Sequence, residues 1–142
     1  MTALTLDLAR SIISAALAKG SELGLKPLTV AVLDSGGALV ALERQDGASR
    51  MRPAIAIGKA NGAVQMGMGS RALFKRAEEQ PYFIQSMNAL AGGSLVPVPG
   101  GVLIRANGAI IGAVGITGDT SDNDETAAVA GIQAAGFDAD GG

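Results

Sequence analysis

Apolar side chains recur with different periods along this chain, and each period predicts a different element. Residues 5–23 repeat them every three or four positions, which predicts an amphipathic helix with an N-cap at Thr5. Short apolar runs at 28–34 and 38–44, joined by an Asp-Ser-Gly-Gly turn, predict a first β-hairpin. The chain is therefore expected to begin with a helix followed by two antiparallel strands.

The middle third returns to a helical period. We expect a helix over 49–65, a polar amphipathic turn or short helix over 71–80 and a further short helical piece over 81–90. Pro53 and Pro81 suit the first turns of helices, because the missing N–H has no intrahelical partner there.

The most apolar stretch, residues 95–120, contains a second hairpin and is predicted to form the middle of the sheet. Asn107-Gly108 is a strong signal for a tight turn, since both residues tolerate the positive φ of a type I′ turn. The arm after the turn, 109–117, is apolar almost throughout, so it is predicted to be a central strand buried on both faces. Gly112 and Gly115 lack a Cβ and would let a helix, another subunit or a ligand approach the backbone of this strand closely.

A last helix begins near Ser121, which is spaced from Asp124 as in a capping box, and ends at Gly136. The final residues, 137–142, read as a flexible tail. The order α–ββ–α(α)–ββ–α predicts one domain over 1–142, of the α+β class, with helices flanking an antiparallel sheet.

Composition changes this picture in one respect. The chain has 142 residues, of which 48% are hydrophobic and 17% are charged. Its mean hydropathy is +0.33. A monomer seldom exposes so much apolar surface, so we expect copies of the chain to cover one another in a homo-oligomer, a dimer or larger.

The net charge and the lengths of the apolar runs indicate which kinds of binding partner the protein is not expected to have. The formal net charge is −2 and the pI is near 5.0, which gives no basic face for nucleic acid. No apolar run reaches the roughly 18 residues that span a bilayer, and the first residues do not read as a signal peptide. The chain has no cysteine, so no disulfide framework forms, and a cytoplasmic location is expected.

The chain also has no histidine. This absence removes the commonest general base and an important haem ligand, and it excludes Ser-His-Asp and Cys-His catalysis. The acidic residues after 118 lack the spacing of an EF-hand and suit helix capping, so no metal site is expected.

Three segments, VAVLDSGGALVALERQDGA, AIAIGKANGA and PGGVLIRANGAIIGAVGITG, are followed by an acidic helix start. This series resembles the GlcG/HbpS-like haem-degrading domain family, which also forms the C-terminal part of PduO-type proteins. The resemblance covers residues 4–136. It implies a five-stranded antiparallel sheet, somewhat profilin-like, in dimers or higher oligomers, and some members bind haem or corrinoids.

The family pattern maps onto individual residues of this chain. Leu103 departs from it, because the family often has proline at that place in the loop. Haem could not be held by histidine here; its ligand would be Tyr82, Lys59 or a methionine such as Met51, Met66 or Met87. The positions that match are Asp34, Lys59-Ala60, Pro99-Gly100-Gly101 and Asp124.

Lys59 is the first candidate for chemistry, because it lies on a helix made otherwise of small and apolar residues. It could bind a carboxylate or, with a lowered pKa, carry a proton. The alternatives are an extended surface lysine or an ion pair with Asp34 or Asp124. Arg50 and Arg52 could hold a carboxylate or propionate in bidentate fashion, or could be ordinary solvated charges at a helix start.

Asp34 could act as an acid or base, or could bond the backbone of its own turn. The amides of Gly100 and Gly101, after Pro99, could hold an oxyanion, or the glycines could simply supply positive φ. The loop is expected to form one edge of a site that faces Lys59.

Two functions follow from these residues, beside a third possibility, an accessory or scaffold protein with no chemistry in a pocket. The first is a small-molecule-binding homo-oligomer, with haem or another tetrapyrrole held between copies without histidine. The second is a cofactor-independent tautomerase, isomerase or hydratase that acts on a small carboxylate in a catabolic pathway. In that second function Lys59 or Asp34 moves a proton, an arginine holds the carboxylate, Asp124 contributes to the binding site, and the glycine amides stabilise an enolate.

Overall fold

The computed structural model describes residues 3–142. In chain order the elements are α1 (Leu6–Glu22), β1 (Thr29–Asp34), β2 (Leu39–Arg44), α2 (Arg52–Met66), α3 (Ser70–Glu79), α4 (Pro81–Leu90), β3 (Gly101–Ala106), β4 (Ala109–Thr117), α5 (Ser121–Ala134) and β5 (Asp138–Asp140).

The strands form one antiparallel sheet with the order β2-β1-β4-β3-β5. Strand β4 lies in the middle and is buried from Ile111 to Thr117, as the apolar arm after the Asn-Gly turn predicts. Asn107 has a φ of 52° and Gly108 a φ of 82°, the geometry that the turn requires. The predicted α+β class and the central position of the second hairpin are confirmed.

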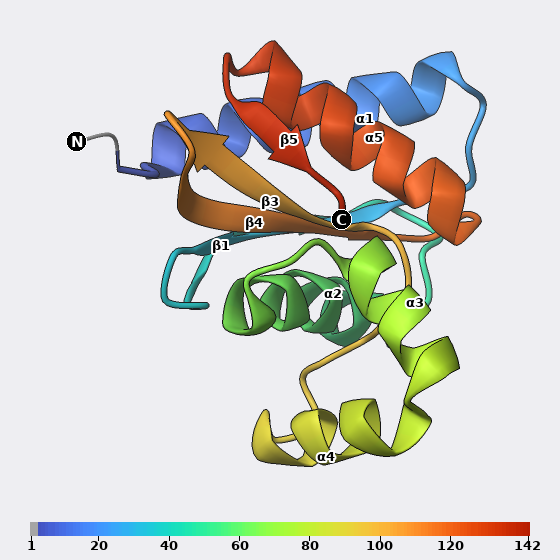
Figure 1. The fold of residues 1–142 in the computed structure, drawn as a ribbon. Coiled ribbons are helices and arrows are strands. Elements are labelled where there is room, and N and C mark those ends of the chain that lie inside the picture. Colours follow the sequence, from blue (N-terminus) through green and yellow to red (C-terminus); the bar gives the residue numbers. More distant parts are fainter. Residues whose placement is uncertain (1–2) are drawn as a thin grey trace.

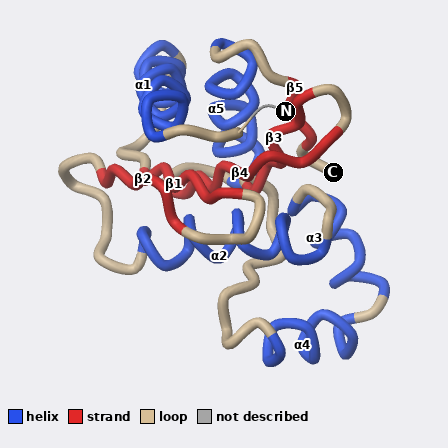
Figure 2. The backbone as a smooth tube through the Cα atoms, turned by 90° about the vertical axis from the view of Figure 1, so that its left-hand side faces the viewer, coloured by secondary structure: helices blue, strands red, loops and turns tan. Residues whose placement is uncertain are grey.

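The elements stack in layers (Figures 1 and 2). Helices α1 and α5 cover one face of the sheet, α2 covers the other with α3 beside it, and α4 lies beyond them, farthest from the sheet. The core under α1 and α5 is large and aliphatic, with Ile12, Ile132 and Val114 fully buried. The core under α2 is small, because Ala60, Ala63 and Ala113 fill much of it.

Gly115 explains how α2 comes so close to the sheet. A Cβ on Gly115 would lie 1.9 Å from the carbonyl oxygen of Ala56, which is shorter than any real contact. The backbone of α2 therefore rests directly on β4, as the glycine in this strand predicts. This close packing sets the depth at which α2 carries Lys59.

The expected flexible tail is wrong for part of its length. Residues 138–140 form β5, the fifth strand that the family resemblance implies, and Asp140 lies opposite Leu103 of β3. Arg105 Nε donates to Asp140 Oδ2 at 2.9 Å, and the Arg71 N–H donates to the Gly141 carbonyl at 3.1 Å. The open edge of β3 offers backbone hydrogen bonds that a short acidic segment with glycines does not reveal by its own pattern.

Candidate functional site

A buried ion pair joins α2 to α5. Lys59 Nζ lies 3.0 Å from Asp124 Oδ2, and the two residues are 2% and 1% exposed. The ion pair lies beside the C-terminal end of β4, and Lys59 Nζ also donates a hydrogen bond to the Ile116 carbonyl there, at 2.9 Å. Of the two acidic partners considered for Lys59, the structure gives it Asp124.

Burial dominates the ionisation of both groups. Desolvation lowers the pKa of Lys59, although the nearby Asp124 carboxylate raises it in part. Desolvation likewise raises the pKa of Asp124, and the Lys59 charge opposes that shift. Both shifts move the pair toward a neutral amine and a neutral carboxylic acid, so a proton can pass between them at a smaller cost than in water.

The Pro99-Gly100-Gly101 loop lies against this pair. A Cβ on Gly100 would lie 2.8 Å from Lys59 Nζ, so there is no space for a side chain at this position. Gly100 also has a φ of 121°, a backbone conformation that residues with a side chain rarely adopt. The loop therefore faces Lys59, as expected from the sequence.

The two glycine amides do not both face a ligand. The Gly101 N–H donates to Ser70 Oγ at 2.6 Å, and Ser70 is fully buried at the start of α3. The prediction that both glycine amides are free to bind an oxyanion is therefore wrong for Gly101, because its N–H already donates a hydrogen bond to the Ser70 hydroxyl.

Arg52 joins the site and Arg50 does not. Arg52 Nη1 donates to Thr117 Oγ1 at 2.7 Å, and its charge contributes to the lowered pKa of Lys59. Thr29 lies directly across the sheet from Thr117, and its buried hydroxyl has no hydrogen-bond partner among the described residues. Arg50 lies exposed in the turn before α2, apart from this cluster.

Asp119 fixes the segment between β4 and α5. Its carboxylate accepts from the Lys26 N–H at 3.0 Å, from the Thr120 N–H at 2.9 Å and from Asn123 Nδ2 at 2.7 Å. These bonds, led by the one from Asn123, lower the pKa of Asp119 to about 2. Its own N–H donates to Asp124 Oδ1 at 3.0 Å, so the segment holds Asp124 in place for Lys59.

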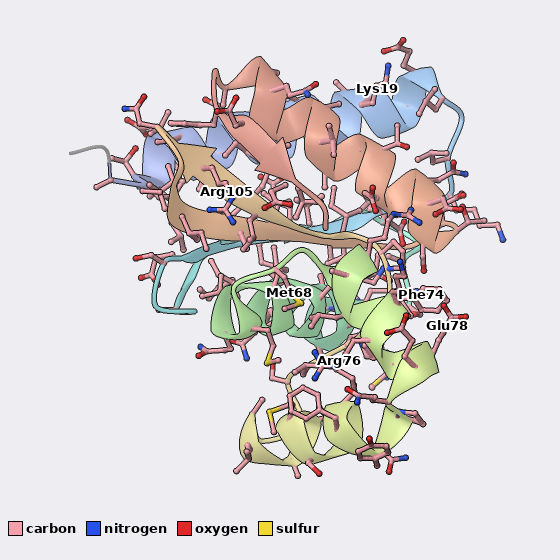
Figure 3. The ribbon with its side chains drawn as sticks, viewed as in Figure 1. Lys19, Met68, Phe74, Arg76, Glu78 and Arg105 are labelled. Carbon is pink, nitrogen blue, oxygen red and sulfur yellow. The ribbon has the colours of Figure 1, made fainter. Side chains whose placement is uncertain are left out.

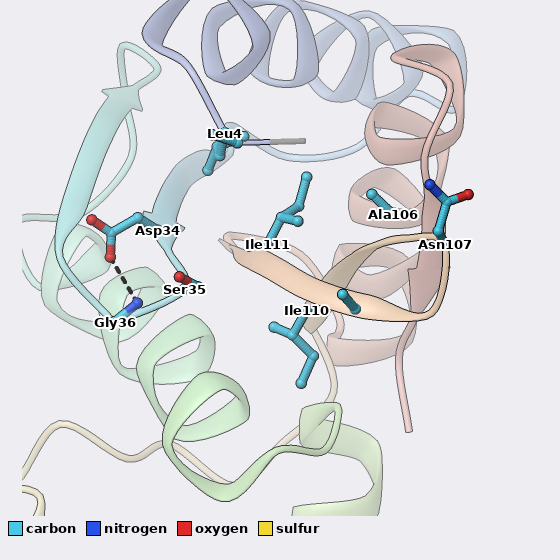
Figure 4. Close-up of a pocket in the computed structure, with 10 residues that line it drawn as sticks. Leu4, Asp34, Ser35, Gly36, Ala106, Asn107, Ile110 and Ile111 are labelled. Atoms are coloured by element: carbon cyan, nitrogen blue, oxygen red, sulfur yellow. Dashed lines mark hydrogen bonds between the residues drawn. The ribbon is translucent and has the colours of Figure 1, made fainter. Parts of the chain in front are cut away.

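Asp34 lies at the other end of the sheet. Strand β1 places Asp34 four residues beyond Val30, which is opposite Ile116, so about 13 Å of strand separates it from the Lys59 pair. Its Oδ1 accepts from the Gly36 and Ala38 N–H groups at 2.9 Å each, and it borders a pocket of about 540 Å³ (Figure 4). The structure thus gives Asp34 the turn-bonding role and does not bring it together with Lys59.

The acidic residues at the start of α5 bind a cation of the protein itself. Arg71 pairs with both Asp122 and Glu125. Among residues 3–142, no three side chains of the metal-binding types converge on one point. Arg71 also lines a groove of about 260 Å³ with Phe74, Val98 and Pro99, so the loop does form a wall on its outer side.

The candidate haem ligands are spread over four places. Met66 and Met87 line a pocket of about 430 Å³ between α2 and α4, together with Asn61, Gln65, Leu90, Ala91 and Leu95. Met51 and Tyr82 are 66% and 68% exposed, and neither lines this pocket. Lys59 is already bonded to Asp124, so the thioethers of the pocket are the better-placed group.

Sequence reasoning missed the residues that hold the site in position. Ser70, Thr117 and Arg71 act through contacts with residues 31, 65 and 54 positions away, which no local pattern reports. The one available signal was Ser70 itself, a polar residue at the start of a predicted helix, and that position reads as an ordinary cap.

No helix within residues 3–142 has both the length and the apolar character to cross a membrane.

Comparisons with known proteins give consistent results. A family model described as haem degrading protein HbpS-like matches residues 4–133. The solved PduOC:haem complex is 25% identical, with a TM-score of 0.85, and the match covers 96% of this chain and 97% of that one. A double mutant of HbpS from Streptomyces reticuli is 29% identical, with a TM-score of 0.79, over 94% of this chain and 87% of that one.

A likeness of fold extends to the protein ORFY from Klebsiella pneumoniae. That structure is 23% identical, with a TM-score of 0.85, over 95% of this chain and 92% of the other. No curated protein is significantly similar in sequence.

Proposed function

Because the chain belongs to the HbpS-like family of haem-degrading proteins, we propose that it binds haem or another tetrapyrrole in a homo-oligomer, without histidine ligation. The observation that carries this proposal is the likeness to the PduOC:haem complex over nearly the whole of both chains. The apolar composition of the chain supports the oligomeric part.

The residues of the pocket between α2 and α4 fit such a ligand. Leu90 and Leu95 give apolar contact for a ring system, and Met66 and Met87 bring thioether sulfur to the same pocket. Methionine is an established axial ligand of haem iron. A bound haem would supply a redox-active iron, while these side chains would exclude water and hold the ring.

Titration with haem tests the proposal. Wild-type protein is expected to shift the Soret band of added haem, and the Met66→Leu/Met87→Leu double variant is expected to bind haem at least tenfold more weakly. Leucine keeps the volume of the pocket while it removes the sulfur, so the fold should be preserved. Visible spectra of the ferric and ferrous states give the measurement.

Two further variants complete the titration. Met51→Leu removes a thioether at the opposite end of α2 and is expected to leave the spectrum unchanged, while Tyr82→Phe tests ligation by the exposed phenol. Absence of a Soret shift in wild-type protein, or a shift that survives in all of these variants, would rule out specific ligation by the proposed residues.

A cofactor-independent enzyme acting on a small carboxylate is the second candidate, and the Lys59 pair favours it. Nζ donates two hydrogen bonds, to Ile116 and Asp124, and an ammonium has three donors. A buried ion pair contributes little to stability over apolar residues of the same size, whereas shifted pKa values are common where protons are transferred. Arg52 beside the pair would hold the carboxylate.

Phenylpyruvate serves as a probe of this second function, because its enol-to-keto conversion requires proton transfer next to a carboxylate. Wild-type protein is expected to accelerate the conversion, followed by ultraviolet absorbance. Lys59→Met/Asp124→Asn, which removes both titrating groups and leaves the pair sterically matched, is expected to lose the acceleration, and Met51→Leu to keep it. Equal rates with and without wild-type protein would argue against the tautomerase.

A further inference from the structure

A row of polar side chains crosses three strands at the end of the sheet next to the Lys59 pair. Arg44 of β2 lies directly opposite Thr29 of β1, and Thr29 lies directly opposite Thr117 of β4. Residues opposite one another in antiparallel strands direct their side chains to the same face of the sheet. Arg52 of α2 donates to the Thr117 hydroxyl, so the row lies on the α2 face. These four residues are called the Arg–Thr row below, and its strand part spans about 10 Å, since neighbouring strands lie about 4.8 Å apart.

The middle of the Arg–Thr row is a hydroxyl without a partner. Thr29 is fully buried, and its Oγ1 has no hydrogen bond to any group among residues 3–142. A buried hydroxyl without a hydrogen bond destabilises the folded state, and nearly all buried polar groups in proteins are therefore paired. The Thr29 hydroxyl is thus expected to receive its partner from outside the chain.

The two arginines of the row carry charges that the protein does not neutralise. No ion pair within the described part of the chain includes Arg44 or Arg52. Arg105 on β3, labelled in Figure 3, shows the contrast, because its guanidinium pairs with Asp140. Arg44 is exposed at the edge of the sheet and Arg52 is half-buried, so a molecule from solvent can reach both.

The acidic side chains nearest to the row are held by other groups or lie in solvent. Asp119 accepts from three N–H donors, and Asp124 accepts from Lys59 and from the Asp119 N–H. Asp46 is exposed in the turn after β2. None of the three pairs with an arginine of the row. The negative charge that matches the row therefore has to come from a ligand.

We propose that the Arg–Thr row is a binding site for the carboxylate of a small organic acid. A planar guanidinium binds a carboxylate through two parallel hydrogen bonds, and bonds to a charged acceptor are stronger than the present bond from Arg52 to a neutral hydroxyl. Arg52 therefore gains by turning from Thr117 to the ligand. Arg44 supplies a second charge from the edge strand, and the Thr29 hydroxyl supplies a donor between the two arginines.

The site lies where the second candidate function needs it. Thr117 follows Ile116, whose carbonyl accepts from Lys59 Nζ, so a carboxylate held by the row has its neighbouring carbon atoms on the side of the Lys59 pair. This inference rests on the proposed enzyme function and assigns its carboxylate-binding residues. Binding of a carboxylate can be measured without catalysis, so the two can fail separately.

Calorimetric titration of the full chain with phenylacetate tests the site, with phenylacetamide as the uncharged probe of the same shape. Neither probe replaces phenylpyruvate in the enol-to-keto conversion, so binding is measured apart from turnover. Wild-type protein is expected to bind phenylacetate about tenfold more tightly than phenylacetamide, because only the acid offers charged acceptors to the guanidinium groups.

Three arginine variants with the same loss of charge locate the site. Arg44→Gln and Arg52→Gln are each expected to weaken phenylacetate binding about tenfold, whereas Arg10→Gln, on the exposed side of α1, is expected to bind it like wild type. Arg52→Lys keeps the charge but loses the bidentate geometry, so it is expected to recover only part of the affinity. Thermal melting followed by circular dichroism establishes that each variant is folded.

Thr29→Val distinguishes a hydroxyl that binds a ligand from one that is only buried. Valine has the same shape without the hydroxyl, so the Tm is expected to rise, while the affinity for phenylacetate is expected to fall about threefold. A rise in Tm with unchanged affinity would overturn the place of Thr29 in the site.

Two further results bear on the site as a whole. Equal affinities of wild-type protein for the two probes, or wild-type affinity in Arg52→Gln, would overturn the carboxylate site. Wild-type protein that binds phenylacetate and does not accelerate the conversion of phenylpyruvate would refute the proposed enzyme and leave the carboxylate site standing.

Discussion

Replacing Lys59 by methionine is expected to lower the free energy of unfolding by about 3–5 kcal/mol, the usual cost of removing one partner from a buried ion pair. The loss is large because Asp124 is 1% exposed and would be left as an unpaired charge. Methionine fills nearly the same volume as the lysine stem, so the effect reports the charge and not a cavity. Urea unfolding at pH 7 measures it.

A double variant tests whether the loss of stability comes from the unpaired charge of Asp124. Lys59→Met/Asp124→Asn removes both charges, and the amide oxygen of asparagine can still accept from the Asp119 N–H. Most of the lost stability should therefore return. A double variant as unstable as the single one would contradict an ion-pair origin of the loss.

The pH dependence of Lys59→Met follows from the carboxyl left behind. Burial already raises the pKa of Asp124 above its unfolded value of 3.8, and loss of the lysine removes the opposing charge. The folded variant then binds more protons than the unfolded chain at pH values above 3.8, so its stability falls as pH rises through the raised pKa. Lys59→Met should thus lose less stability relative to wild type near pH 4 than at pH 7. A loss independent of pH would show that Asp124 does not carry the effect.

Gly115→Ala is expected to cost about 3 kcal/mol, the upper end of the usual penalty for adding a methyl group to a packed interior. The added Cβ would lie 1.9 Å from the Ala56 carbonyl, and that oxygen belongs to helix backbone, which cannot rotate away. Either α2 rises from the sheet or β4 bends. Chemical unfolding measures the loss of stability.

Gly36→Ala is the matched control, since its Cβ would meet only Asp34 Oδ1, at the ordinary distance of 3.5 Å. Its stability is expected to stay within about 0.5 kcal/mol of wild type. A small effect of Gly115→Ala, equal to that of the control, would mean that α2 can move off β4 at little cost.

Local sequence determined most of the elements, because their signals lie within a few residues of one another. The Asn107-Gly108 turn fixes the second hairpin through its positive φ values, and the apolar run after it can be satisfied only by burial on both faces. Lys59 also stood out by its pattern alone, as a charge among small side chains on a helix.

Tertiary structure decided which of these residues meet. Asp34 and Asp124 were equal partners for Lys59 in the sequence. The antiparallel register of β1 and β4 places Asp34 at the far end of the sheet, whereas α5 brings Asp124 to Lys59. The Gly101 amide looked free until α3 brought Ser70 to it. The last residues became a strand because the edge of β3 supplies bonding partners that they lack among themselves. Each of these outcomes depends on contacts between residues more than 30 positions apart, and such contacts leave no trace in the local period of a chain.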